Sequence, residues 1–250
     1  MLPQPKGSIH LFRAFGVNVY LHWSWFFVAA IQIQYRRIFD SAWWHLLMYV
    51  SLFGIVLLHE FGHALACRSV GGVANRIVLW PLGGVAYVQP PPRPGAVLWS
   101  IVAGPLVNVV LVPLTLLIWI VAQVYAPSMS EDAMQYFQYI VIINAGLLIF
   151  NMLPIYPLDG GQTLQALLWF VIGRSKSLAI TAAVGMGAAV VVGVFALVQR
   201  DLWILILAMF VGWQAFNGFR VARYLAVEEA AERDQEARWA KVYGRWDEGP

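Results

Sequence analysis

Charged residues are scarce in this 250-residue chain, at 12% against 60% hydrophobic residues. Soluble domains carry about twice that charged share, roughly 25%, so the composition excludes an ordinary soluble globular protein. Several apolar stretches are long enough to cross a lipid bilayer, which takes about 20 residues. The sequence therefore predicts an all-α polytopic membrane protein.

Cysteine is also nearly missing, because Cys67 is the single example. One thiol excludes an intrachain disulfide and a CxxC metal site. The net charge of +3 is modest, and the basic residues lie at the ends of the apolar stretches instead of forming one stripe. This distribution speaks against a nucleic-acid partner.

The apolar stretches predict about six transmembrane helices. Their expected ranges are 20–35, 44–67, 96–124, 135–153, 178–198 and 202–219. Between the second and third, residues 72–95 hold two short apolar runs separated by Pro81, Gly83 and Gly84. This pattern predicts a β-hairpin with both glycines in its turn. Because the hairpin is too short to span the bilayer, we expect it to be re-entrant or interfacial.

The spans divide the chain into three expected parts: an N-terminal lead-in (1–19), a membrane-embedded domain (20–221) and a charged helical tail (222–250). Lys and Arg are enriched in cytoplasmic loops. If the N-terminus is inside, most loop Lys and Arg lie inside, and those outside are Arg36, Arg37 and Arg200. This predicts a multi-pass protein of a bacterial or archaeal cytoplasmic membrane, with both termini in the cytoplasm.

The second predicted span carries ionisable residues inside the apolar run VLLHEFGHAL (56–65). HEFGH is an H-E-x-x-H motif, and on a helix His59 and His63 are one turn apart and face the same side. Two imidazoles at that spacing can bind one zinc ion. Glu60 is rotated about 100° from His59, so it flanks the metal and can take a proton from water there.

A catalytic zinc ion usually has three protein ligands and an open position. Among the acids, Glu60 lies within a predicted span and Asp159 follows the inner end of another, while the other acids are assigned to loops or the tail. The second and fourth spans both run toward the inner side, so Asp159 is expected at the depth of the histidines. Two prolines precede Asp159, and Gly160-Gly161 follow it and permit close backbone packing. Asp159 is the predicted third ligand, with a turn or an N-cap of a short helix at 161–172 as the alternative.

Four motifs occur together in this membrane protein: HEFGH (59–63), a GG-containing hairpin (82–86), GPLVN (104–108) and NMLPIYPLDGGQ (151–162). Over roughly residues 10–220 the chain resembles the site-2 proteases, intramembrane zinc metalloproteases of peptidase family M50. The resemblance implies one Zn²⁺ per chain, with His59, His63 and Asp159 as ligands and Glu60 as general base. The short loops predict a minimal member, without the PDZ or CBS modules of larger ones.

Further site residues come from the same resemblance. Asn151 is expected to hold the substrate carbonyl or the oxyanion, with a structural hydrogen bond to loop backbone as the alternative. Asn108 is predicted to bind substrate, with a helix-to-helix hydrogen bond as the alternative. Backbone unwound in lipid needs hydrogen-bond partners, so the hairpin residues Gly83, Gly84 and Val85 are expected to bind substrate by β-strand addition.

The predicted function is that of a zinc metalloendopeptidase, which hydrolyses peptide bonds in or near transmembrane segments of single-span membrane proteins. Two alternatives stay open. Histidine and aspartate in spans also occur in metal transporters, and a catalytically silent scaffold of the same fold would bind without cleaving. A metal analysis and a cleavage assay distinguish the three functions. A protease would bind one zinc ion tightly and cleave, a transporter would show zinc flux, and a scaffold would show neither.

Overall fold

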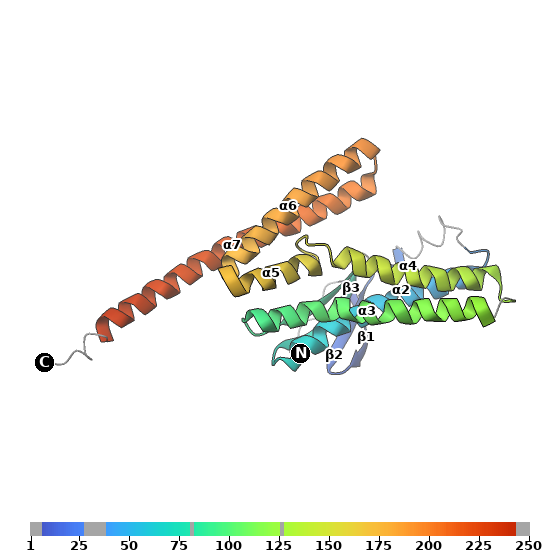
Figure 1. Cartoon of the computed structure of the whole chain (residues 1–250), viewed down its shortest axis with the longest axis horizontal. Helices are drawn as coiled ribbons and strands as arrows, with labels where there is room; N and C mark the ends of the chain where they lie inside the picture. The colour runs from blue at the N-terminus through green and yellow to red at the C-terminus, as the bar shows by residue number, and fades with distance from the viewer. Residues whose placement is uncertain (1–6, 28–38, 81–82, 126–127, 244–250) are drawn as a thin grey trace. The chain divides into compact units, whose positions relative to one another are not determined.

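The computed structural model describes residues 7–27, 39–80, 83–125 and 128–243, and it is mostly helical with one small sheet (Figure 1). The chain forms two compact units, the first ending at Met152 and the second beginning at Leu153.

The first unit contains a four-stranded sheet whose strands are β1 (Ser8–Ala14), β2 (Val17–His22), β3 (Val73–Trp80) and β4 (Gly83–Gln89). The strands pair in that order. The pairs β1–β2 and β3–β4 are antiparallel, whereas β2 and β3 are parallel. The sheet thus joins the start of the chain to the hairpin that was predicted between the second and third spans.

Residues 8–22 differ from the predicted lead-in and from the start of the predicted first span, because they form strands. The alternation in β2 buries Val17 and Val19 completely, as one face of a pleated strand requires. Val19 pairs with Ile77, far along the chain, and such long-range pairing leaves little local signal. Half of the predicted first span, 28–35, lies outside the described residues.

The predicted hairpin is confirmed as β3 and β4, but its turn is placed differently. Trp80 pairs with Gly83 and Leu79 pairs with Gly84, so both glycines are strand residues. The two residues between the strands, 81–82, lie outside the described part of the chain. The assignment of Gly83-Gly84 to the turn is wrong because glycine also serves where a strand must approach another group closely.

Three long helices complete the first unit: α2 (Ala42–Ser69), α3 (Pro94–Tyr125) and α4 (Glu131–Asn151). Ser41 and Ser130 cap α2 and α4, since each hydroxyl oxygen accepts a backbone N–H of the first turn. The three helices run side by side in Figure 1. They correspond to the second, third and fourth predicted spans.

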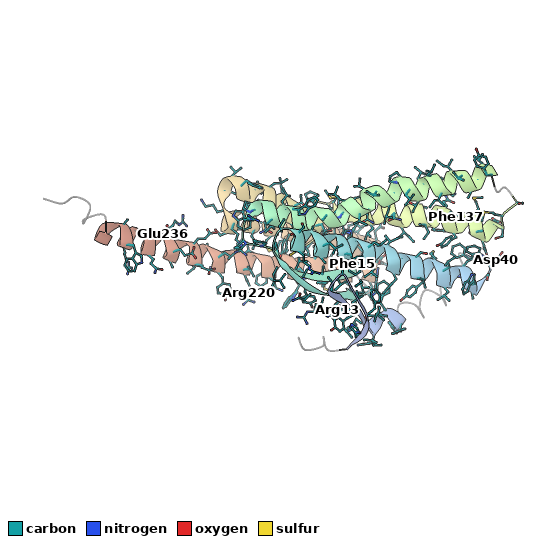
Figure 2. The ribbon with its side chains drawn as sticks, turned by 90° about the horizontal axis from the view of Figure 1, so that it is seen from below. Arg13, Phe15, Asp40, Phe137, Arg220 and Glu236 are labelled. Carbon is teal, nitrogen blue, oxygen red and sulfur yellow. The ribbon has the colours of Figure 1, made fainter. Side chains whose placement is uncertain are left out.

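The starts of α2 and α4 are tied together. The two carboxylate oxygens of Asp132 accept the backbone N–H groups of Asp40 and Ser41, at 3.1 and 3.2 Å. Figure 2 shows this end of the unit, where Asp40 and Phe137 are labelled. The contact fixes the two helix starts beside each other.

The hydrophobic core of the first unit lies between the sheet and α2. Ile77 and Leu79 of β3 are fully buried against Val56 and Ala64 of α2. Burying a large aliphatic side chain is worth about 1.5–3 kcal/mol. Because this face of α2 packs against the sheet, the rotation of the helix about its own axis is fixed.

The second unit consists of α5 (Asp159–Ile172), α6 (Arg174–Gln199) and α7 (Leu202–Tyr243). The short helix predicted at 161–172 is thereby confirmed as α5. Arg200 adopts the left-handed conformation, with φ 56°, and ends α6. Asp201 then caps α7 by accepting the first N–H groups of that helix.

The helix α7 is continuous over 42 residues, so the predicted sixth span and the described part of the charged tail, up to Tyr243, form one helix. Figure 2 shows Arg220 and Glu236 along it. Within the described residues, five helices are long and apolar enough to cross a membrane: α2, α3, α4, α6 and α7. The chain is an integral membrane protein. The predicted count of six spans includes the range 20–35, of which only residues 20–27 are described.

Gly62 of α2 packs directly on α3, because a Cβ there would lie 2.5 Å from the carbonyl oxygen of Ala103. Gly54 on the same helix has open space at its Cβ position. We expect Gly62→Ala to lower the free energy of unfolding by about 1–3 kcal/mol through overpacking. Gly54→Ala is the matched control and should be neutral or slightly stabilising.

Thermal unfolding in detergent, followed by circular dichroism, measures both variants. Equal shifts in Tm for Gly62→Ala and Gly54→Ala would contradict the close packing of α2 on α3.

Candidate metal centre

The two histidines of the H-E-x-x-H motif lie on α2 and face each other. His59 and His63 are 3% and 6% exposed. Their Nε2 atoms are 3.1 Å apart. The one-turn spacing on a helix places both rings on the same face, as predicted. The two rings bond to residues of α3, so they lie on a different face of α2 from the face that packs on the sheet.

The other ring nitrogen of each histidine is held by an acceptor on α3. The Nδ1–H of His63 donates to the carbonyl oxygen of Ser100 at 2.9 Å. The Nδ1–H of His59 donates to Oδ1 of Asn108 at 2.7 Å. A carbonyl oxygen can only accept, so both imidazoles carry their proton on Nδ1. The unprotonated Nε2 atoms are therefore the pair that meets.

This arrangement fits a shared metal ion. Two Nε2 lone pairs that converge at 3.1 Å in a buried site can both bind one cation. Two nitrogen ligands of one tetrahedral zinc ion are about 3.3 Å apart, given zinc–nitrogen bonds of about 2.0–2.1 Å. A histidine that binds a metal through one ring nitrogen commonly donates the N–H of its other ring nitrogen to a protein oxygen. Both imidazoles do so here.

Gly104 of the GPLVN motif makes room for His63. A Cβ at this position would lie 2.2 Å from Nε2 of the imidazole, a distance that no side chain can occupy. The neighbouring Pro105 is fully buried inside α3. The motif thus lets a ring of α2 lie directly against the backbone of α3.

Glu60 lies between α2 and the sheet. Its side chain is buried, and its Oε2 accepts the backbone N–H of Ala86 at 2.7 Å. A Cβ on Gly84 would lie 2.2 Å from Cγ of Glu60. Gly84 is therefore required by the approach of the carboxylate to β4, which explains its place in a strand.

Asn108 is fully buried. Its side-chain oxygen and its side-chain nitrogen each form a hydrogen bond to another helix. Its Oδ1 accepts from His59, and its Nδ2 donates to Oδ1 of Asn144 at 3.2 Å. These contacts form the hydrogen bond between helices that was the alternative interpretation. The predicted substrate contact of Asn108 stays a prediction. Asn144 belongs to no motif, and the sequence offered only one signal for it, a polar residue in a span.

Asn151 is the last residue of α4 and is half-buried. Met152 follows as the C-cap residue, with its N–H bonded to the carbonyl oxygen of Leu148. The expected role of Asn151 toward a substrate carbonyl stays a prediction.

Asp159 belongs to the second unit and is the first residue of α5. The N-cap of that helix is Leu158, so the predicted N-cap alternative for Asp159 is wrong. A carboxylate in the first turn is still favoured by the helix dipole. The loop before it is held by Gln162, whose side chain donates to the carbonyl oxygen of Pro157 at 2.9 Å.

Three glycines of the second unit admit the loop that precedes Asp159. A Cβ on Gly161 would lie 2.4 Å from the backbone of Ile155, which confirms the predicted close packing. A Cβ on Gly185 or Gly218 would lie 2.4 or 2.7 Å from Tyr156. This burial raises the pKa of the Tyr156 hydroxyl above its ordinary value. The loop is thus seated tightly on α5, α6 and α7.

Comparison with known proteins decides the family. The family model for Peptidase family M50 matches residues 47–128 and 114–195, more than half of the chain. The chain belongs to peptidase family M50. The predicted relationship is therefore confirmed, and the matched region includes both histidines and Asp159.

Relatives within the family are similar over most of this chain. A zinc metalloprotease of Methanocaldococcus jannaschii is 30% identical over 214 residues, which are 86% of this chain and 61% of the relative. Stage IV sporulation protein FB of Bacillus subtilis is 28% identical over 198 residues, 76% of this chain and 64% of the relative. The chain spans less than two thirds of the length of these curated relatives.

The solved structure of a site-2 protease from Methanocaldococcus jannaschii is similar in fold. The TM-score is 0.61 at 28% identity, over 85% of this chain and 95% of that one. The M50 fold, long apolar helices with a small sheet, is thus shared.

Gly104→Ala is expected to disrupt the histidine pair. The added Cβ would force the His63 ring to turn, which breaks its bond to Ser100. We expect the affinity for added Zn²⁺ to fall by about 10- to 100-fold, as measured by competition with a chromogenic chelator. Gly146→Ala on α4, where the Cβ position is open, is the matched control. Unchanged affinity in Gly104→Ala would contradict the assignment of His63.

Proposed function

We propose that this member of peptidase family M50 is a zinc-dependent endopeptidase, which hydrolyses peptide bonds in or near transmembrane segments of other membrane proteins. One observation carries the proposal. Two buried imidazoles present unprotonated Nε2 atoms to each other at 3.1 Å, and the carboxylate of Glu60 on the same helix lies at the edge of a strand. The names of the relatives as zinc metalloproteases support it.

The proposed ligands of one Zn²⁺ are His59, His63 and Asp159. The bonds of both Nδ1–H groups keep the two imidazoles in the ligand tautomer. Asp159 is supported by its place in the LPIYPLDGG motif of the family and by the tightly seated loop that precedes it. When bound, zinc supplies a Lewis acid that polarises a scissile carbonyl and makes water a nucleophile near neutral pH.

Glu60 is the proposed general base. It takes a proton from the attacking water and later gives it to the leaving amine. The backbone N–H of Ala86 holds its carboxylate in place, so little reorganisation is required at the moment of reaction. Asn151 is proposed to donate its amide N–H to the substrate carbonyl or to the oxyanion, which is supported by its match to the family asparagine.

The edge of β4 is the proposed binding surface for an unwound substrate. Among the described strands, β4 is the last in the order of the sheet. The N–H of Ala86 points away from β3 to Glu60, and by strand alternation the backbone of Gly84 faces the same edge. A substrate strand added here would run beside the general base. Gly83, Gly84 and Val85 are the proposed contacts, and Val85 is about half exposed.

The proposed setting is a bacterial or archaeal cytoplasmic membrane, with six spans and both termini in the cytoplasm. The distribution of Lys and Arg supports this orientation. The proposed substrates are single-span membrane proteins, whose helix must unwind before its peptide bonds can be reached.

Glu60→Gln is expected to retain zinc and to lose cleavage, because the amide keeps the shape of the side chain but cannot accept the proton of water. The loss of kcat should be at least about 10²- to 10⁴-fold. Cleavage of a single-span substrate in proteoliposomes is followed by gel, and bound zinc by mass spectrometry. The control is Glu131→Gln, on the exposed first turn of α4. Undiminished cleavage by Glu60→Gln would contradict the role of Glu60 as general base, and zinc flux in place of cleavage would contradict the proposed endopeptidase.

Asp159→Ala is expected to remove one zinc ligand and therefore to lower the zinc affinity by several powers of ten, with cleavage lost in parallel. Asp234→Ala changes an exposed aspartate of α7 and is the matched control. Zinc content after dialysis against a weak chelator separates the two variants. Full zinc retention by Asp159→Ala would show that the third ligand lies elsewhere.

A further inference from the structure

Two buried asparagines link His59 to a backbone carbonyl of α4. Beyond the bonds of Asn108 to His59 and to Asn144, the Nδ2 of Asn144 donates to the carbonyl oxygen of Ile140 at 3.3 Å. Asn108 and Asn144 have no exposed surface, and His59 has almost none. The series of hydrogen bonds therefore connects α2, α3 and α4 inside the first unit.

The direction of this series is determined at its far end. The carbonyl oxygen of Ile140 can only accept, so Asn144 must turn its Nδ2 toward it and its Oδ1 toward Asn108. Asn108 must then present Nδ2 to Asn144 and Oδ1 to His59. His59 in turn must donate from Nδ1, which leaves its Nε2 unprotonated.

The alternative arrangement carries a penalty wherever it is introduced. If His59 carried its proton on Nε2, its bare Nδ1 would face Oδ1 of Asn108. Flipping either asparagine only moves the clash between acceptors along the series, until it reaches Ile140. An unsatisfied buried polar group costs about 1–3 kcal/mol, and no exposed surface lets water relieve it.

The two histidines are thus held in different ways. His63 donates directly to the carbonyl oxygen of Ser100, a backbone group. His59 depends on two side chains that could rotate if one were removed. We propose that Asn144, acting through Asn108, is a positioning residue that sets the tautomer of His59 for metal binding; the metal is the zinc of the proposed function, on which this inference rests.

The test uses the full-length protein in detergent and the variant Asn144→Ala. In the metal-free protein in alkaline buffer, ¹⁵N-labelled histidine shows by NMR which ring nitrogen carries the proton. The wild type should show His59 protonated on Nδ1, and Asn144→Ala should show a mixture of both tautomers. His63 is an internal control, because its acceptor is untouched, and it should not change.

Zinc affinity gives a second readout. Asn144→Ala should bind zinc about tenfold more weakly. Adding Asn144→Ala to Asn108→Ala should then cost little more, because both changes break one series. The matched control is Ile140→Ala, which removes a buried side chain from α4 but keeps the backbone carbonyl that accepts from Asn144.

The outcomes separate the hypotheses. An unchanged His59 tautomer and unchanged zinc affinity in Asn144→Ala would overturn the proposal. An equal loss in Ile140→Ala, or a change at His63 as large as that at His59, would also overturn it, since general loosening of the helices would explain the result. If the wild type bound no zinc, the proposed function would fail, and the NMR measurement would still decide the role of Asn144.

Discussion

Two unprotonated imidazole nitrogens meet at 3.1 Å inside a bundle of apolar helices, and the rest of the first unit is arranged around that contact. Because their lone pairs converge in a buried site, one cation can bind both. The protein holds them there with acceptors on α3, Ser100 for one ring and Asn108 for the other. The sheet keeps α2 in the rotation that makes this possible.

Close approach is achieved by leaving out side chains. Three glycines of the first unit lie where a Cβ would overlap a neighbouring group. For Gly62 this group is the backbone of α3, for Gly84 the side chain of Glu60, and for Gly104 the ring of His63. The same device seats the loop before Asp159 in the second unit, where Gly185 is one of the glycines involved. In a bundle without a hydrophobic driving force between helices, contacts of this kind supply much of the packing energy.

The sequence predicted the helices well because each is a long apolar run, and α5 was recognised from its own pattern. It placed His59, Glu60 and His63 beside one another because they lie within five residues of one helix. It did not reveal β1 and β2, since Val19 pairs with Ile77 across a long stretch of chain. It also placed Gly84 in a turn, because glycine signals a turn in most local contexts, whereas here the residue clears space for Glu60.

The sequence by itself determined the class of protein, the helical spans and the histidine pair, because hydropathy and helical periodicity act between near neighbours in the chain. Only the tertiary structure decided which nitrogen of His59 carries the proton. That choice depends on Asn108 and Asn144, from two other helices, and on a backbone carbonyl at Ile140 that can only accept. Hydrogen-bond direction is a property of groups that meet in space, and no local pattern encodes it.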